Sequence, residues 1–128
     1  YLFSNSIPPM VAGAAIEMFN LIDRTNELQD KLHSNTAYFV EKMKAAGFDI
    51  KPTQSAICAV MLYDAKLSQD FAAALQQEGI YVTGFYYPVV PKGQARIRVQ
   101  VSAAHEREHL DRCIAAFTKI GKQLGVIK

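Results

Sequence analysis

The sequence has few of the features that mark a membrane-spanning or nucleic-acid-binding protein. Lysine and arginine exceed aspartate and glutamate by only two charges, and no basic stripe with interleaved aromatic residues is present. No apolar run approaches the length of a bilayer span, and no signal-peptide pattern occurs. Neither a nucleic acid nor a membrane is therefore expected as a partner, and the default location is the cytoplasm or an organelle matrix, of which the cytoplasm is expected.

The sequence is also poor in groups that hold metals or attack substrates. Its two cysteines, Cys58 and Cys113, have neither the spacing of a metal knuckle nor that of a redox pair, and they are expected as free, buried thiols. His105 and His109 have helical spacing but no third ligand, so no metal site is expected, and His105 is interpreted as a residue at the entry of a helix. No nucleophile with a base, no paired carboxylates and no glycine-rich phosphate loop can be assembled. Chemistry alone does not predict an autonomous enzyme.

What the sequence does contain is the pattern of one folded domain over residues 1–128. Half of the residues are hydrophobic and a fifth are charged. Periodicity and turn residues predict four helices and four strands. The helices are expected over residues 10–24, 27–46 and 65–78 and after Ser102, with Leu124 in the apolar stripe of the last, and the strands over residues 48–51, 57–63, 80–83 and 96–101. The first helix is apolar nearly all round, which predicts that it is largely buried. The fold class is therefore α+β, a small, mostly antiparallel sheet with helices packed on one face.

The stretch PVVPKGQARIRVQVSAAH, residues 88–105, contains the most informative strand. Apolar and polar residues alternate from Arg96 onward, so Arg96 and Arg98 are expected on the face opposite Ile97. Two guanidinium groups on one face can bind a carboxylate or phosphate through paired hydrogen bonds. A solvated sheet face without a ligand is the alternative reading, since charged residues are ordinarily exposed.

Two other clusters of residues, one polar and one aromatic, have more than one possible role. Ser4 and its neighbours Asn5 and Ser6 precede two prolines, and their hydroxyl and amide groups suit helix capping or a turn. Four aromatic residues around the loop before the arginine strand either line a pocket or fix the loop; they are Tyr81, Phe85, Tyr86 and Tyr87.

Three blocks carry a resemblance to a known family: YLFSNSIPP at the start, EGIYVTGFYYPVVPKGQARIRVQVSAAH, and FTKIGKQLGVIK at the end. Together they resemble the C-terminal region of the α-oxoamine synthases, fold-type-I enzymes that depend on pyridoxal 5'-phosphate (PLP), and among these the glycine C-acetyltransferases. The resemblance implies the small C-terminal domain of a homodimeric enzyme that condenses glycine with acetyl-CoA to 2-amino-3-oxobutyrate in threonine degradation. Residues 1–8 are then an arm from a large domain that this sequence does not contain.

The resemblance also assigns roles to single residues. Arg98 matches the second arginine of the family's RIR strand, which binds the substrate carboxylate, and Arg96 is its neighbour. Ser4 matches the hydroxyl residue that reaches the cofactor phosphate of the neighbouring subunit, and residues 86–94 match a mobile segment near the active-site mouth. The family's Schiff-base lysine and cofactor-binding aspartate lie upstream of this arm. The fragment is therefore expected to contain no catalytic residue, to bind no PLP alone and to be inactive.

Two alternatives remain. Another α-oxoamine synthase would use a different acyl-CoA, as in 8-amino-7-oxononanoate, 5-aminolevulinate or sphingoid-base synthesis. A protein of another class would be a stand-alone module that binds anions or another subunit through its arginine face. If the chain is a fragment of the larger enzyme, its apolar first helix is expected to leave apolar surface exposed on the isolated chain.

Overall fold

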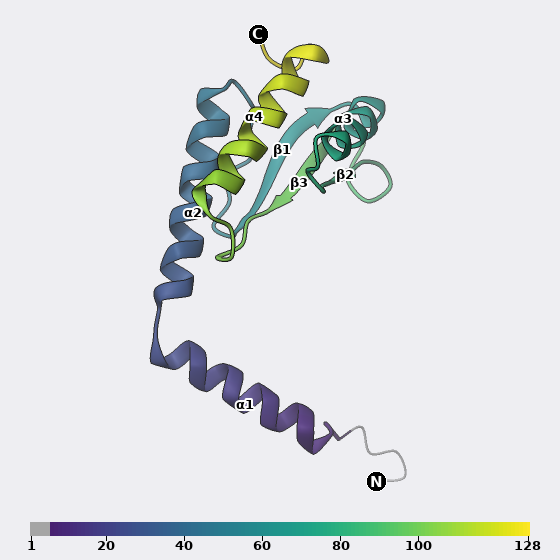
Figure 1. The fold of residues 1–128 in the computed structure, drawn as a ribbon. Helices are drawn as coiled ribbons and strands as arrows, with labels where there is room; N and C mark the ends of the chain where they lie inside the picture. Colours follow the sequence, from purple (N-terminus) through teal and green to yellow (C-terminus); the bar gives the residue numbers. More distant parts are fainter. Residues whose placement is uncertain (1–5) are drawn as a thin grey trace.

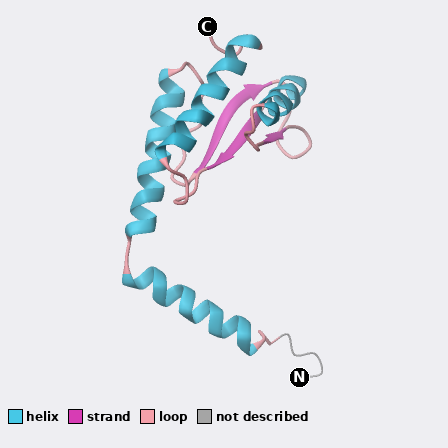
Figure 2. Cartoon of the chain, viewed as in Figure 1, coloured by secondary structure: helices cyan, strands magenta, loops and turns pink. Residues whose placement is uncertain are grey.

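The computed structural model describes residues 6–128 and contains four helices and three strands (Figure 1). In chain order these are α1 (Pro9–Arg24), α2 (Glu27–Ala45), β1 (Ile57–Tyr63), α3 (Ala65–Gln77), β2 (Thr83–Phe85), β3 (Ala95–Gln100) and α4 (Arg107–Gln123). The strands form one antiparallel sheet in the order β1-β3-β2, and α2, α3 and α4 lie on one face of it (Figure 2). The expected α+β class is confirmed.

The core lies between this face of the sheet and the three helices. Four phenylalanine rings meet there with centroids 5.5 to 6.4 Å apart, mostly edge to face, an arrangement that aromatic quadrupoles favour. These rings are Phe39, Phe48, Phe71 and Phe117, all buried. Because they come from α2, the segment after it, α3 and α4, one cluster fixes all three helices on the sheet.

Two expected strands differ from the structure. The segment 48–51 forms only an isolated bridge between Ile50 and Val60, because Gly47, at a φ of 100°, turns the chain into it and Pro52 ends it. The strand expected at 80–83 begins only at Thr83, because the N–H of Ile80 is bonded to the carbonyl of Leu75 at the end of α3. The strand β2 therefore shares only Thr83 with the expected strand and continues through Gly84 and Phe85, which were expected in the loop that follows.

The first helix is a larger correction. It begins at Pro9 as its proline predicts, but none of its residues is buried, although its composition predicts a largely buried helix. Figure 1 shows α1 extending away from the sheet, joined to α2 through residues 25 and 26. No other element of residues 6–128 covers it, so the predicted burial is wrong for this chain and the predicted exposure of apolar surface is right.

A smaller correction concerns the last helix. Leu124 was expected in its apolar stripe, but α4 ends at Gln123 and the Leu124 side chain is 39% exposed. Leu110 and Phe117, which belong to the same stripe, are buried as expected.

Close packing of β2 on α3 gives a first testable prediction. A Cβ atom on Gly84 would lie 2.8 Å from both the carbonyl oxygen and the Oγ of Ser68, closer than such atoms pack. Gly84→Ala should therefore destabilise the core by about 1 to 3 kcal/mol, the usual cost of overpacking, as measured by denaturant unfolding. Gly13→Ala in α1 is the control, since nothing lies within 4 Å of its Cβ position. Equal effects of the two changes would contradict the proposed contact.

The exposed helix gives a second prediction. Phe19 and Ile22 on α1 are 65% and 58% exposed, and the isolated chain should self-associate through this surface as its concentration rises. In sedimentation velocity, a Phe19→Ser, Ile22→Ser double variant should shift the chain toward monomer. Leu28→Ser, which removes an exposed leucine outside α1, should not. A wild-type chain that stays monomeric at high concentration contradicts the prediction.

Candidate functional site

The position of Arg98 follows from the alternation of β3. Ile97 and Val99 point into the core, whereas Arg98 is exposed on the face that the helices leave open. Arg98 is paired with Ala59 of β1 and with Thr83 of β2, so the backbone on both sides holds it in place. The expectation that the isoleucine and valine side chains face the helices and the arginine faces outward is confirmed.

The guanidinium of Arg98 is oriented but not neutralised. Its Cζ atom lies 5.1 Å from the ring centroid of Phe85, within the range of a cation–π contact. Among residues 6–128 no carboxylate lies within salt-bridge distance of Arg98. Stacking on an aromatic face leaves the in-plane N–H groups of a guanidinium available for a planar anion.

A hollow of about 550 Å³ opens beside this arginine. Among residues 6–128, neither a lysine nor an acidic residue lines it, and Arg98 is the one fixed cation that this part of the chain places there. Its walls are Tyr81, Val82, Thr83, Phe85, Arg98, Gln100, Ser102 and His105. The arrangement suits a small anion that takes additional hydrogen bonds from hydroxyl, amide or imidazole groups.

Several residues singled out in the sequence lie away from this hollow. Arg96 is half-buried and does not line it; the backbone carbonyl of Arg96 instead accepts a hydrogen bond from the buried hydroxyl of Ser68. Tyr86, Tyr87 and the rest of the 86–94 loop do not line it either. Ser4 lies outside the described residues, so its expected role remains a prediction.

The loop after β3 is held by the Asn35 side chain of α2, a contact that the sequence did not predict. The Asn35 side chain on α2 is 3% exposed, and its Nδ2 atom donates to the carbonyls of Ser102 and His105 at 3.3 and 2.7 Å. A buried amide that satisfies two loop carbonyls fixes the chain between β3 and α4. An asparagine inside an otherwise apolar stripe was the signal that could have revealed this contact.

The start of α4 adds a second fastening to the same loop. His109 Nδ1 accepts a hydrogen bond from the N–H of Glu106, the N-cap residue. Lys31 on α2 binds the Glu106 carboxylate at 2.6 Å, and this hydrogen bond lowers the pKa of Glu106 below its usual value. Glu106 is exposed and Lys31 is only half-buried, so water reaches the pair and the contact positions the loop more than it stabilises the fold.

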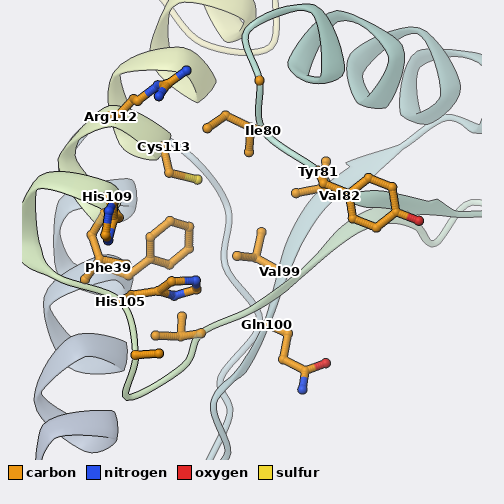
Figure 3. A pocket seen from close by; sticks show the side chains of 14 residues that line it. Phe39, Ile80, Tyr81, Val82, Val99, Gln100, His105, His109, Arg112 and Cys113 are labelled. Carbon is orange, nitrogen blue, oxygen red and sulfur yellow. The ribbon is translucent and has the colours of Figure 1, made fainter.

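A second hollow of about 430 Å³ lies on the helix side of the sheet edge (Figure 3). Residues 80–82 form one wall of it, and β3 and α4 form others. Its other lining residues are Phe39, Gly79, Val99, Gln100, Val101, Ala104, His105, His109, Leu110, Arg112 and Cys113. It is mostly apolar, and within residues 6–128 no group of three metal-ligating side chains occurs there or elsewhere.

Comparison with known proteins identifies the family of this chain. Residues 1–117 match the model of aminotransferase class I and II. The chain belongs to the aminotransferase class I and II family. As one of its members, the chain is 56% identical over 127 residues to 2-amino-3-ketobutyrate coenzyme A ligase of Escherichia coli K12, a match that covers 99% of this chain and 32% of the relative. The chain thus spans about a third of the length of the curated relatives that it matches.

Other relatives show how widely this region occurs. The mitochondrial human 2-amino-3-ketobutyrate coenzyme A ligase is 47% identical over 99% of the chain and 30% of its own length. The 8-amino-7-oxononanoate synthase of Petrotoga mobilis is 43% identical over 99% and 32%. Among solved structures, a serine palmitoyltransferase from S. paucimobilis with bound PLP superposes with a TM-score of 0.88 and 30% identity, over 98% of this chain and 32% of that one. The resemblance stated from the sequence is confirmed.

The two cysteines give a prediction about thiol reactivity: Cys58 is buried as expected, whereas Cys113 is only half-buried. Burial raises the pKa of both Cys58 and Cys113 to about 11, so at pH 8 only about one thiol in a thousand is ionised. Both thiols should react with a disulfide reagent far more slowly in the native chain than in urea, and the native rate should rise about tenfold per pH unit up to about pH 11. Cys58→Ser and Cys113→Ser variants assign the two rates. Rapid reaction of either native thiol at pH 8 contradicts the prediction.

Proposed function

We propose that the intact protein is a PLP-dependent glycine C-acetyltransferase, which condenses glycine with acetyl-CoA to 2-amino-3-oxobutyrate in threonine degradation. The observation that carries the proposal is the free, ring-stacked guanidinium of Arg98 in a chain 56% identical to a 2-amino-3-ketobutyrate coenzyme A ligase. Arg98 holds the glycine carboxylate through paired hydrogen bonds from its guanidinium, as α-carboxylates are commonly bound.

The cofactor belongs to the intact protein. Bound PLP supplies the electron sink that stabilises negative charge at the α-carbon of glycine. No lysine lines the Arg98 hollow, so the described residues fit the task of orienting the amino acid and do not provide an attachment point for the cofactor. Ser4, through its hydroxyl, is proposed to bind the cofactor phosphate of the other subunit, which makes a homodimer the working assembly.

The location of the intact protein is also a proposal. Within the described part of the chain no helix is long and apolar enough to cross a bilayer. We propose the cytoplasm. One relative, the human 2-amino-3-ketobutyrate coenzyme A ligase, is mitochondrial.

A second candidate differs in the acyl donor. The 43% identity to an 8-amino-7-oxononanoate synthase supports it, because such an enzyme also needs a carboxylate clamp for its amino acid. Assaying the full-length protein with a panel of acyl-CoA thioesters separates the two, since preference for acetyl-CoA supports the first candidate and preference for a longer thioester the second.

The role of Arg98 can be tested in the full-length enzyme. Arg98→Ala should weaken the use of glycine by about 1.5 to 3 kcal/mol, the range for a hydrogen bond to a charged group, seen as a fall in kcat/KM for glycine. Arg98→Lys should restore only part of it, because an ammonium lacks the paired donors. Arg107→Ala is the control, since Arg107 packs over the Tyr38 ring at 4.3 Å and does not line the hollow. Unchanged kinetics for glycine in Arg98→Ala would overturn the assignment.

A further inference from the structure

The two hollows meet at the edge of the sheet, and His105 stands where they meet. They share four lining residues, Tyr81, Val82, Gln100 and His105. Figure 3 shows the His105 ring projecting from the loop after β3 toward Val99, into the space between the strands and α4. The same residue also lines the hollow of Arg98, so His105 is the imidazole at the border of the two hollows.

The hydrogen bonds of His105 determine which of its nitrogens can act there. Nδ1 accepts a hydrogen bond from the backbone N–H of Ser102 at 3.2 Å. In the neutral ring the proton is therefore on Nε2, which becomes a donor. Within residues 6–128 Nε2 has no hydrogen-bond partner, and the side chain is half-buried.

The backbone under this ring is fixed in advance. Asn35 holds the carbonyl of His105 itself at 2.7 Å, and the N–H of His105 bonds to the carbonyl of Ser102 at 3.1 Å. The imidazole thus has a defined ring orientation, a defined tautomer and one free donor. A group held in this way is preorganised to bind, because little freedom is lost when it does so.

We propose that Nε2–H of His105 donates a hydrogen bond to the carboxylate held by Arg98, and that it serves as a second determinant of selectivity for amino acids with a free carboxylate. The inference rests on the proposed function, because it takes the Arg98 ligand to be the glycine carboxylate. A carboxylate has more acceptor positions than one guanidinium fills, so a second donor at its side is not in competition with Arg98. A neutral donor also adds recognition without adding a charge to the hollow.

Two substitutions in the full-length enzyme separate this role from a purely structural one. In His105→Asn the amide oxygen can replace Nδ1 and accept from Ser102, but nothing replaces Nε2–H. In His105→Gln the amide nitrogen can replace the Nε2–H donor, but the Nδ1 acceptor is lost. The asparagine variant should raise the KM for glycine about tenfold or more and leave the KM for acetyl-CoA unchanged, whereas the glutamine variant should stay within about threefold of wild type.

If the glutamine variant has the higher KM for glycine, His105 only anchors the loop, and the inference is overturned. Equal KM values for the two variants would overturn it as well. KM does not depend on the fraction of folded enzyme, so partial unfolding leaves the comparison valid. As a second measurement, the preference for glycine over glycinamide should narrow in His105→Asn. A preference equal to wild type also counts against the inference.

Controls distinguish this inference from the proposed function. His33→Asn changes an exposed histidine on α2 that does not line the hollow and should leave both KM values unchanged. If Arg98→Ala raises the KM for glycine and His105→Asn does not, the His105 inference alone is overturned. If Arg98→Ala has no effect, the carboxylate assignment that underlies both is overturned.

Discussion

The structure depends on the central position of β3, which is hydrogen-bonded on both sides. Pairing with β1 and β2 fixes the register, and a slip of one residue would move every side chain to the opposite face. In the observed register Ile97 seals the helix-covered core while Arg98 is presented on the open face. The same constraint therefore stabilises the domain and aims the guanidinium, so the site cannot be moved without disrupting the core.

The loop that follows β3 forms another wall of the hollow, and it is also held in a fixed position. The loop before α4 is fastened to α2 through Asn35, whose buried amide would be costly to leave unpaired. Because Asn35 binds the carbonyls of Ser102 and His105, the loop holds the His105 imidazole in a fixed position, as β3 holds the Arg98 guanidinium. The hollow thus has one rigid wall from the sheet and another from a loop made rigid by a helix.

The sequence was sufficient where a local pattern determines structure. The apolar run of β1 predicts residues 57–63, the range observed, and the alternation of β3 predicts the face of Arg98. The sequence was insufficient where contacts between segments determine the structure. The N–H of Ile80 bonds to the carbonyl of Leu75 at the end of α3, and β2 therefore begins only at Thr83. The grouping of His105 with Arg98 in the lining of one hollow was also not predicted, because it arises from how the chain turns after the strand, and no spacing in the sequence records that turn. The expected burial of α1 failed for a related reason, since apolar composition predicts that a helix needs a partner but not that the partner lies within the same chain.

Exposure to water limits how strongly Arg98 can bind an anion in this chain alone. Ion pairs that water reaches are worth only about 0 to 1 kcal/mol, because solvent and salt screen them. The same guanidinium and carboxylate attract each other several times more strongly at the lower effective dielectric of a covered site. This chain spans about a third of its relatives' length, and both the apolar surface of α1 and the open face of β3 are left uncovered within residues 6–128. The guanidinium proposed to bind the carboxylate is thus already oriented by these residues, whereas the strength of that binding would depend on how far water is excluded from the hollow.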